Sequence, residues 1–158
     1  MERRDIRSIL VPTDLSESSV PALRLARLLA DRLGASLTVM FADLTTYPVD
    51  MFTDTPVVYS DAGVEEYQKL RGEIALRLQE WLDGRPFDVI VLTGQPATMI
   101  LHAAALQKTD LIVMGTHGRR GVAHALLGSV AEKVVRLAPM PVLTVHGEDG
   151  QNLASNEA

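Results

Sequence analysis

The feature that most constrains the fold is a repeated change in hydrophobic spacing along the chain. Short apolar runs suited to buried strands alternate with longer segments in which apolar residues recur every three or four positions, as on one face of a helix. This alternation is typical of βα units, which build a parallel sheet covered by helices. We therefore predict an α/β fold with one principal domain in the 158 residues.

Five apolar runs are the predicted strands. They cover residues 9–11, 37–42, 88–93, 111–114 and 142–145. The run at 37–42 is apolar almost without interruption, which is typical of a strand buried on both faces of a parallel sheet.

The helices are predicted from apolar stripes at helical spacing. The first stripe consists of Ala22, Leu25, Ala26, Leu29 and Leu33, with Gly34 placed to end the helix. The start of this helix stays open: Ser16 is one possible N-cap, whereas Pro21 favours a start at Ser18 or Ser19. A second helix carries Tyr67 and Trp81, for which core packing is the simpler interpretation.

Two segments have little to bury. Residues 43–62 are rich in aspartate, proline and threonine and are predicted to form a surface loop. Residues 147–158 are predicted to be a disordered tail, so the domain is expected to span 1–146.

The composition excludes several classes of function. Fifteen Lys plus Arg against twenty Asp plus Glu give a formal net charge of −5, which argues against general nucleic-acid binding. The absence of cysteine excludes disulfides and thiolate chemistry. No apolar run approaches the roughly 20 residues of a membrane-spanning helix, and no export signal is visible. We expect a cytoplasmic protein that interacts with neither membranes nor nucleic acid.

A glycine-containing segment from residue 115 to 129 carries the chemistry. It starts at the carboxyl end of a predicted strand, where parallel sheets bind ligands, and leads into a helix whose first N–H groups suit an anion. Gly115 and Gly118 allow close approach of the backbone to a ligand. The segment fits neither the P-loop pattern nor G-x-G-x-x-G. By itself it is compatible with a phosphate site and with an ordinary turn.

The spacing of Gly115, Gly118, Gly128 and Ser129, which is G-x2-G-x9-G-[ST], resembles the nucleotide loop of the universal stress protein family. Further blocks at 9–14, 110–115, 129–135 and 139–145 resemble the same family, in the same order along the chain. The similarity extends over about residues 6–146.

The resemblance implies a three-layer α/β sandwich with a five-stranded parallel sheet, flavodoxin-like or adenine nucleotide alpha hydrolase-like, and a homodimer. Members that keep the glycine loop bind ATP, so the resemblance implies binding of ATP or ADP with Mg²⁺ here. The implied nucleotide-binding residues are Pro12, Thr13, Asp14, Ala42, Met114, Gly115, His117, Gly118, Arg119, Gly128, Ser129 and Val130. Asp14 is placed near the ribose and the metal-bound phosphates, and Ala42 meets the adenine edge through its backbone.

The residues themselves leave simpler roles open. Asp14 can cap the turn that follows it, and the Thr13 hydroxyl can satisfy a turn as easily as a nucleotide. Arg119 and His117 can be solvated loop residues. The remaining histidines show no spacing suited to a metal.

No catalytic motif is found, so binding is better supported than turnover. The leading hypothesis is an ATP-binding switch in the stress response with slow or no hydrolysis. One alternative is a dimeric interaction module without functional nucleotide binding, and another is an enzyme acting on an adenylated substrate. The dimer is expected to form through the fifth strand, where Leu143 and Val145 share one face.

Overall fold

A five-stranded parallel sheet forms the centre of the computed structural model, which describes residues 5–43, 61–116 and 127–146. The elements follow in the order β1 (Ser8–Thr13), η1 (Glu17–Ser19), α1 (Val20–Leu33), β2 (Ser36–Asp43), α2 (Asp61–Trp81), β3 (Asp88–Thr93), α3 (Pro96–Leu106), β4 (Leu111–Gly115), α4 (Ser129–Leu137) and β5 (Val142–Val145). All four strand pairings are parallel. The predicted α/β fold and its five strands are therefore confirmed.

The strands lie in the order β3-β2-β1-β4-β5. The chain thus builds one half of the sheet outward from β1, crosses back through α3, and builds the other half from β4. A flavodoxin-like sheet has the order 2-1-3-4-5. Of the two alternatives named from the sequence, the flavodoxin-like one therefore does not describe this strand order.

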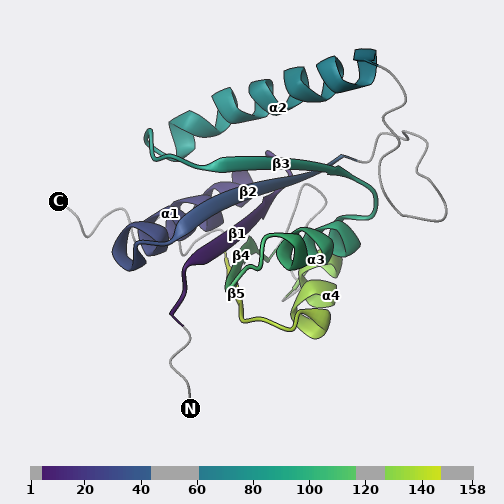
Figure 1. The fold of residues 1–158 in the computed structure, drawn as a ribbon. Helices are drawn as coiled ribbons and strands as arrows, with labels where there is room; N and C mark the ends of the chain where they lie inside the picture. The colour runs from purple at the N-terminus through teal and green to yellow at the C-terminus, as the bar shows by residue number, and fades with distance from the viewer. Residues whose placement is uncertain (1–4, 44–60, 117–126, 147–158) are drawn as a thin grey trace.

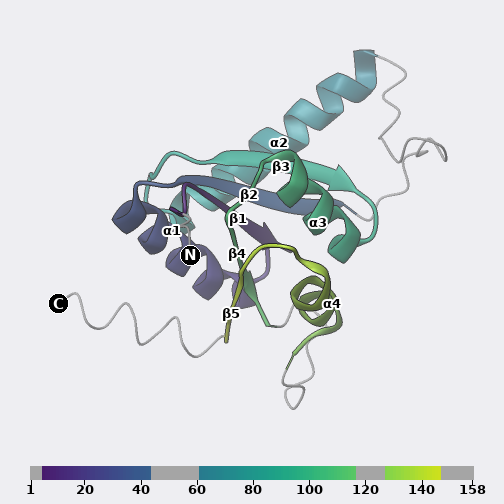
Figure 2. The ribbon, with the colours of Figure 1, turned by 60° about the horizontal axis from the view of Figure 1, so that its bottom comes forward.

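Two hydrophobic cores cover the two faces of the sheet. α1 and α2 pack on one face around Ile9, Val11, Val39 and Val113. α3 and α4 pack on the other face around Leu10, Met40, Ile112 and Met114. α3 and α4 lie side by side below the sheet in Figure 1 and come forward in Figure 2. The result is the predicted three-layer sandwich.

α1 buries a slightly different stripe from the predicted one. Its fully buried residues are Ala22, Leu23, Ala26 and Ala30, while Leu25 and Leu29 pack at the margin. Leu33 is 48% exposed, so its predicted place in the core is wrong. The buried alanines let the helix lie close against the sheet, with Leu23 facing inward and Leu33 at the end of the helix facing solvent.

The ends of α1 follow the sequence signals. Glu17–Ser19 forms a single 3₁₀ turn, and Ser19 is the N-cap of α1, which agrees with the later of the two predicted starts. Pro21 falls in the first turn, where its missing N–H costs no intrahelical bond. Gly34 ends the helix in the left-handed conformation with φ 64°, as predicted.

α2 is longer than the sequence predicts. It begins at Asp61, and β2 ends at Asp43, so both ends of the predicted loop 43–62 belong to regular elements. Residues 44–60 lie outside the described part of the chain, as does the predicted tail 147–158. Tyr67 is 36% exposed, so core packing is wrong for this residue, whereas Trp81 packs partly buried against the α1 side of the core.

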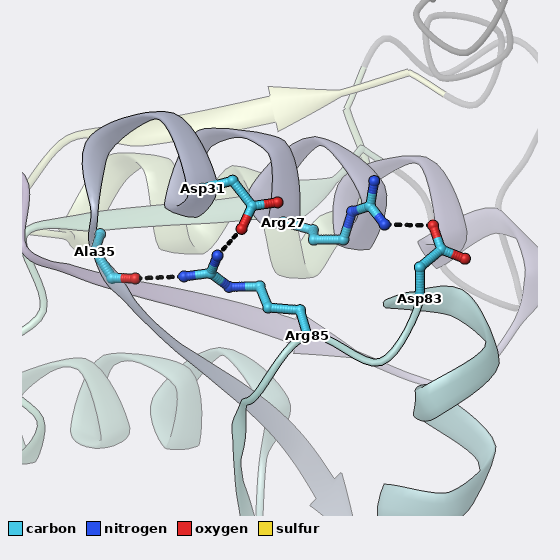
Figure 3. Close-up of polar contacts among 5 residues, drawn as sticks. All are labelled: Arg27, Asp31, Ala35, Asp83 and Arg85. Carbon is cyan, nitrogen blue, oxygen red and sulfur yellow. Dashed lines mark hydrogen bonds and ion pairs between the residues drawn. The ribbon is translucent and has the colours of Figure 1, made fainter.

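Two arginine–aspartate pairs connect α1 to the turn after α2 (Figure 3). Arg27 pairs with Asp83, and Arg85 pairs with Asp31. Arg85 also donates from Nη2 to the carbonyl oxygen of Ala35 at 2.7 Å. Because Arg85 reaches two groups at the end of α1, it fixes the path of the chain from α2 into β3.

Asp110 ties the beginnings of β1 and β4 together. Its Oδ2 accepts the backbone N–H groups of Arg7 and Ser8 at 2.9 and 3.0 Å. We expect Asp110→Ala to lower the free energy of unfolding by about 1–3 kcal/mol, because two donors lose a charged acceptor. Urea unfolding of this variant beside Asp110→Asn, which keeps one amide oxygen, measures the effect; an unchanged midpoint for the alanine variant would contradict it.

β5 lies at one edge of the sheet, as the resemblance implied. Its two same-face residues do not form one exposed strip. Val145 is 4% exposed and belongs to the core beside α1, whereas Leu143 is 37% exposed. Only Leu143 of this predicted pair is available to a partner. Among the described helices, none is long and apolar enough to cross a membrane.

Candidate functional site

The carboxyl ends of β1 and β4 lie next to each other at the switch point of the sheet, where the strand order reverses. β1 leads through α1 to β2 on one side, and β4 leads through α4 to β5 on the other. Their connections therefore leave toward opposite faces of the sheet. In the part of the chain that the structure describes, the paired residues of these strands are Ile9 with Leu111 and Leu10 with Ile112. The ladder ends before the carboxyl ends, where open α/β sheets bind their ligands.

Asp14 follows β1 at this point and is held by the turn after it. Its Oδ1 accepts the backbone N–H of Ser16 at 3.0 Å and also the Ser16 hydroxyl. The capping role considered from the sequence is therefore present. It is compatible with a ligand role, because an ionised carboxylate offers about four lone-pair positions.

The Thr13 hydroxyl is used inside the same turn. It is 8% exposed, lies 2.8 Å from the Ser19 hydroxyl and accepts the N–H of Leu15 at 3.0 Å. Of the two roles that the sequence leaves open for this side chain, the structure shows the turn role. Contact with a ligand through the Thr13 side chain stays a prediction.

The two ends of the glycine segment are bonded to each other. The N–H of Gly128 donates to the carbonyl oxygen of Thr116 at 2.7 Å, and the N–H of Thr116 donates to Val145 of the edge strand at 3.1 Å. Gly128 is also the N-cap of α4, and its carbonyl oxygen accepts the N–H of Glu132 at 2.8 Å. The amino end of α4 is thereby fixed directly beside the end of β4.

This closure presents the first turn of α4 at the carboxyl edge of the sheet. The N–H groups of the first helical residues have no acceptor within a helix, and the helix dipole adds partial positive charge there. In α4 these residues are Ser129, Val130 and Ala131. Ser129 is exposed, whereas Val130 packs partly buried against the α3–α4 core. The arrangement suits an anion, such as a phosphate group.

The other predicted residues occupy the same edge in different ways. Pro12 lies inside β1 opposite Met40, and Ala42 lies near the end of β2 opposite Leu92. Met114 is 5% exposed and its side chain belongs to the core, so only its backbone is placed for a ligand. Gly115 ends β4. The predicted residues His117, Gly118 and Arg119 lie outside the described part of the chain.

Asp14 is the one predicted metal ligand. Within residues 5–43, 61–116 and 127–146, no group of three or more His, Cys, Asp or Glu side chains gathers as a metal site would require. Magnesium, however, is commonly held by one or two carboxylates together with phosphate oxygens and water. A single aspartate at the same edge as a helix amino end suited to phosphate is compatible with that mode.

Ser16 and Ser19 were not predicted as site residues. The sequence offered them only as helix caps, because a serine before an apolar stripe has that role most often. The structure gives neither a side-chain capping bond to its helix. Both instead organise the turn that carries Asp14. The three serines at positions 16, 18 and 19 are the signal from which this could have been inferred.

The fold and this edge define an open α/β protein with an acidic turn and a helix amino end at its switch point. The family model of the universal stress proteins matches residues 5–146, so the chain belongs to the universal stress protein family.

Individual relatives agree with this assignment. A universal stress protein of Thermus aquaticus is 38% identical over 88% of this chain and 98% of its own length. Universal stress protein MJ0531 of Methanocaldococcus jannaschii is 35% identical over 88% of this chain and 81% of its own length. A crystal structure of a universal stress protein in complex with cAMP is similar with a TM-score of 0.63 and 25% identity, covering 90% of this chain and 98% of that one.

Proposed function

We propose that this protein binds ATP with Mg²⁺ at the carboxyl edge between β1 and β4 and acts as a nucleotide-dependent switch in the stress response. The observation that carries the proposal is the bond from Gly128 to Thr116. It fixes the amino end of α4 beside β4, where the N–H groups of Ser129 and Val130 can donate hydrogen bonds to phosphate oxygens.

The remaining parts of the site fit the same ligand. Asp14, held by Ser16, supplies a carboxylate for the ribose hydroxyls or for magnesium bound to the phosphates. Ala42 offers backbone groups to the base at the end of β2. The similar protein crystallised with cAMP shows that this fold can accept an adenine nucleotide in another family member, which supports the choice of ligand class.

Isothermal titration calorimetry of the purified chain with ATP, with and without Mg²⁺, tests the proposal. Mass spectrometry of nucleotide released on denaturation identifies any copurified ligand. Heat of binding with ATP that strengthens with Mg²⁺ supports the proposal. Absence of heat from nucleotide-free protein would overturn it and favour the interaction module that the sequence left as the alternative.

We expect ATP hydrolysis to be slow. Rapid phosphoryl transfer needs a residue that orients water or accepts its proton, and the sequence contains no motif that identifies one. Magnesium and helix N–H groups stabilise bound ATP as well as its transition state, and uniform stabilisation does not accelerate the chemistry. Single-turnover assays with labelled ATP measure the rate; a value within the usual enzyme range of about 1–1000 per second would contradict the switch.

We also propose that two copies pair through β5. Edge strands present unpaired backbone groups, and exposed Leu143 adds apolar contact at this edge. We expect light scattering at micromolar concentration to give a dimer mass. Leu143→Asp should shift the population toward monomer, because a carboxylate would be buried in the contact. A monomer mass for the native chain would count against this pairing.

A further inference from the structure

The turn between β1 and α1 contains a buried chain of hydroxyl hydrogen bonds. The Ser19 hydroxyl lies 2.7 Å from the carbonyl oxygen of Ser16, which can only accept. A hydroxyl has one proton. The Ser19 hydroxyl donates it to the Ser16 carbonyl oxygen, so it must accept a hydrogen bond from the Thr13 hydroxyl. Thr13 in turn accepts the N–H of Leu15. The direction of every bond in this chain is therefore determined.

These hydrogen bonds hold an unusual backbone conformation at Leu15. Leu15 has φ 60°, a left-handed conformation that leucine rarely adopts. The Leu15 side chain packs against the α1 side of the core, and its N–H donates a hydrogen bond to the Thr13 hydroxyl oxygen. Thr13 and Ser19 are both buried, at 8% and 5% exposure, so water competes little for these hydroxyls. Such a conformation persists where the surroundings determine it.

A second series of hydrogen bonds connects Ser16, whose carbonyl oxygen accepts from Ser19, to Asp14. Ser16 donates its backbone N–H and its hydroxyl to Asp14 Oδ1. Because the Ser16 proton is used there, the Ser18 hydroxyl, 2.7 Å away, donates to Ser16. Ser16 is thus held from one side by Ser19 and itself holds the carboxylate of Asp14.

We propose that Ser19 and Thr13 are positioning residues, which act through Ser16 to orient the Asp14 carboxylate toward the nucleotide. This inference rests on the proposed function, since it concerns the same site. It gives Thr13 a different role from the one implied by the family resemblance. The Thr13 hydroxyl donates to Ser19 and therefore has no proton to offer a phosphate oxygen.

A double-mutant cycle in calorimetry with Mg-ATP tests the coupling. We expect Ser19→Ala to raise the Kd roughly twofold to tenfold. The same change made in an Asp14→Ala background should raise it no further, because the group that Ser19 orients is gone. Additive losses would overturn the positioning role while leaving the proposed function intact. No heat with the native chain would overturn both.

A second pair of variants guards against a simple folding defect. Thr13→Val keeps the shape of the side chain and removes its hydroxyl, whereas Thr13→Ser restores the hydroxyl. We expect weakened Mg-ATP binding for the valine variant and near-native binding for the serine variant, with both folded by circular dichroism. Equal affinity of the two would contradict the role of the hydroxyl.

Amide hydrogen exchange gives a readout without nucleotide. Removing the Thr13 hydroxyl leaves the Leu15 N–H without its acceptor, so exchange at Leu15 should be faster in Thr13→Val and native-like in Thr13→Ser. Unchanged exchange in the valine variant would show that this chain of bonds does not hold the turn, and would overturn the inference.

Discussion

Leu23→Ala should destabilise the protein by about 2–5 kcal/mol, the largest effect on stability expected here. Leu23 is 0% exposed and belongs to the core between α1 and the sheet. Truncation removes apolar contact and leaves a cavity that neighbouring β-strands cannot close without breaking their ladder. At roughly 2–4 °C per kcal/mol for a chain of this size, the melting temperature should fall by several degrees or more.

Leu33→Ala on the same helix is the matched control. It removes the same atoms, but Leu33 is 48% exposed, so we expect a loss of about 1 kcal/mol or less. Calorimetric melting of both variants gives the comparison. The stripe predicted from the sequence ranks these leucines the other way round, since it includes Leu33 and omits Leu23. Equal losses would therefore contradict the packing of α1 in the structure.

The contrast between Leu23 and Leu33 shows where sequence periodicity stops being informative. Apolar spacing located α1 and its end at Gly34, because a helix and its cap depend on neighbouring residues. It did not determine the rotation of the helix about its axis. That rotation depends on which side chains the sheet can accommodate, and the buried alanines at 22, 26 and 30 settle it through tertiary contact.

The strand order had a similar limit. The alternation of strands and helices predicts a parallel sheet, and all five strands were located. The flavodoxin order and the observed order have the same alternation, so periodicity cannot separate them. The two orders differ in the place of β3, which lies outside β2 here and beside β1 in the flavodoxin order, and this depends on long-range contacts.

For the candidate site, the sequence predicted the places of residues in the fold better than their hydrogen-bond roles. Asp14 directly follows β1 and Gly128 directly precedes α4, as predicted, and their contact with a nucleotide stays a prediction. The roles of Thr13 and Ser19 depend on which hydroxyl donates to which, and this is visible only when both side chains are placed. Serines that organise a turn and serines that cap a helix have the same pattern in sequence.

Ser129→Pro should weaken Mg-ATP binding roughly tenfold to hundredfold, the largest effect expected on the proposed function. Ser129 is the first residue of α4, the position at which proline is favoured in helices. Proline there removes one N–H group, which no intrahelical bond uses, from the proposed phosphate site. The preceding residue, Gly128, has φ −71° and ψ 158°, a conformation compatible with a following proline.

Ser129→Ala separates the backbone donor from the hydroxyl, because alanine keeps the N–H and loses only the side-chain oxygen. A neutral hydroxyl contributes less to phosphate binding than a helix N–H aligned with the dipole, so we expect the alanine variant to lose several-fold at most. Both variants should melt within a few degrees of the native chain, since neither change affects the core. Calorimetry with Mg-ATP then compares them directly. Equal affinities for the proline and alanine variants would mean that the Ser129 N–H does not contact the nucleotide, and the phosphate would have to be held elsewhere along this edge of the sheet.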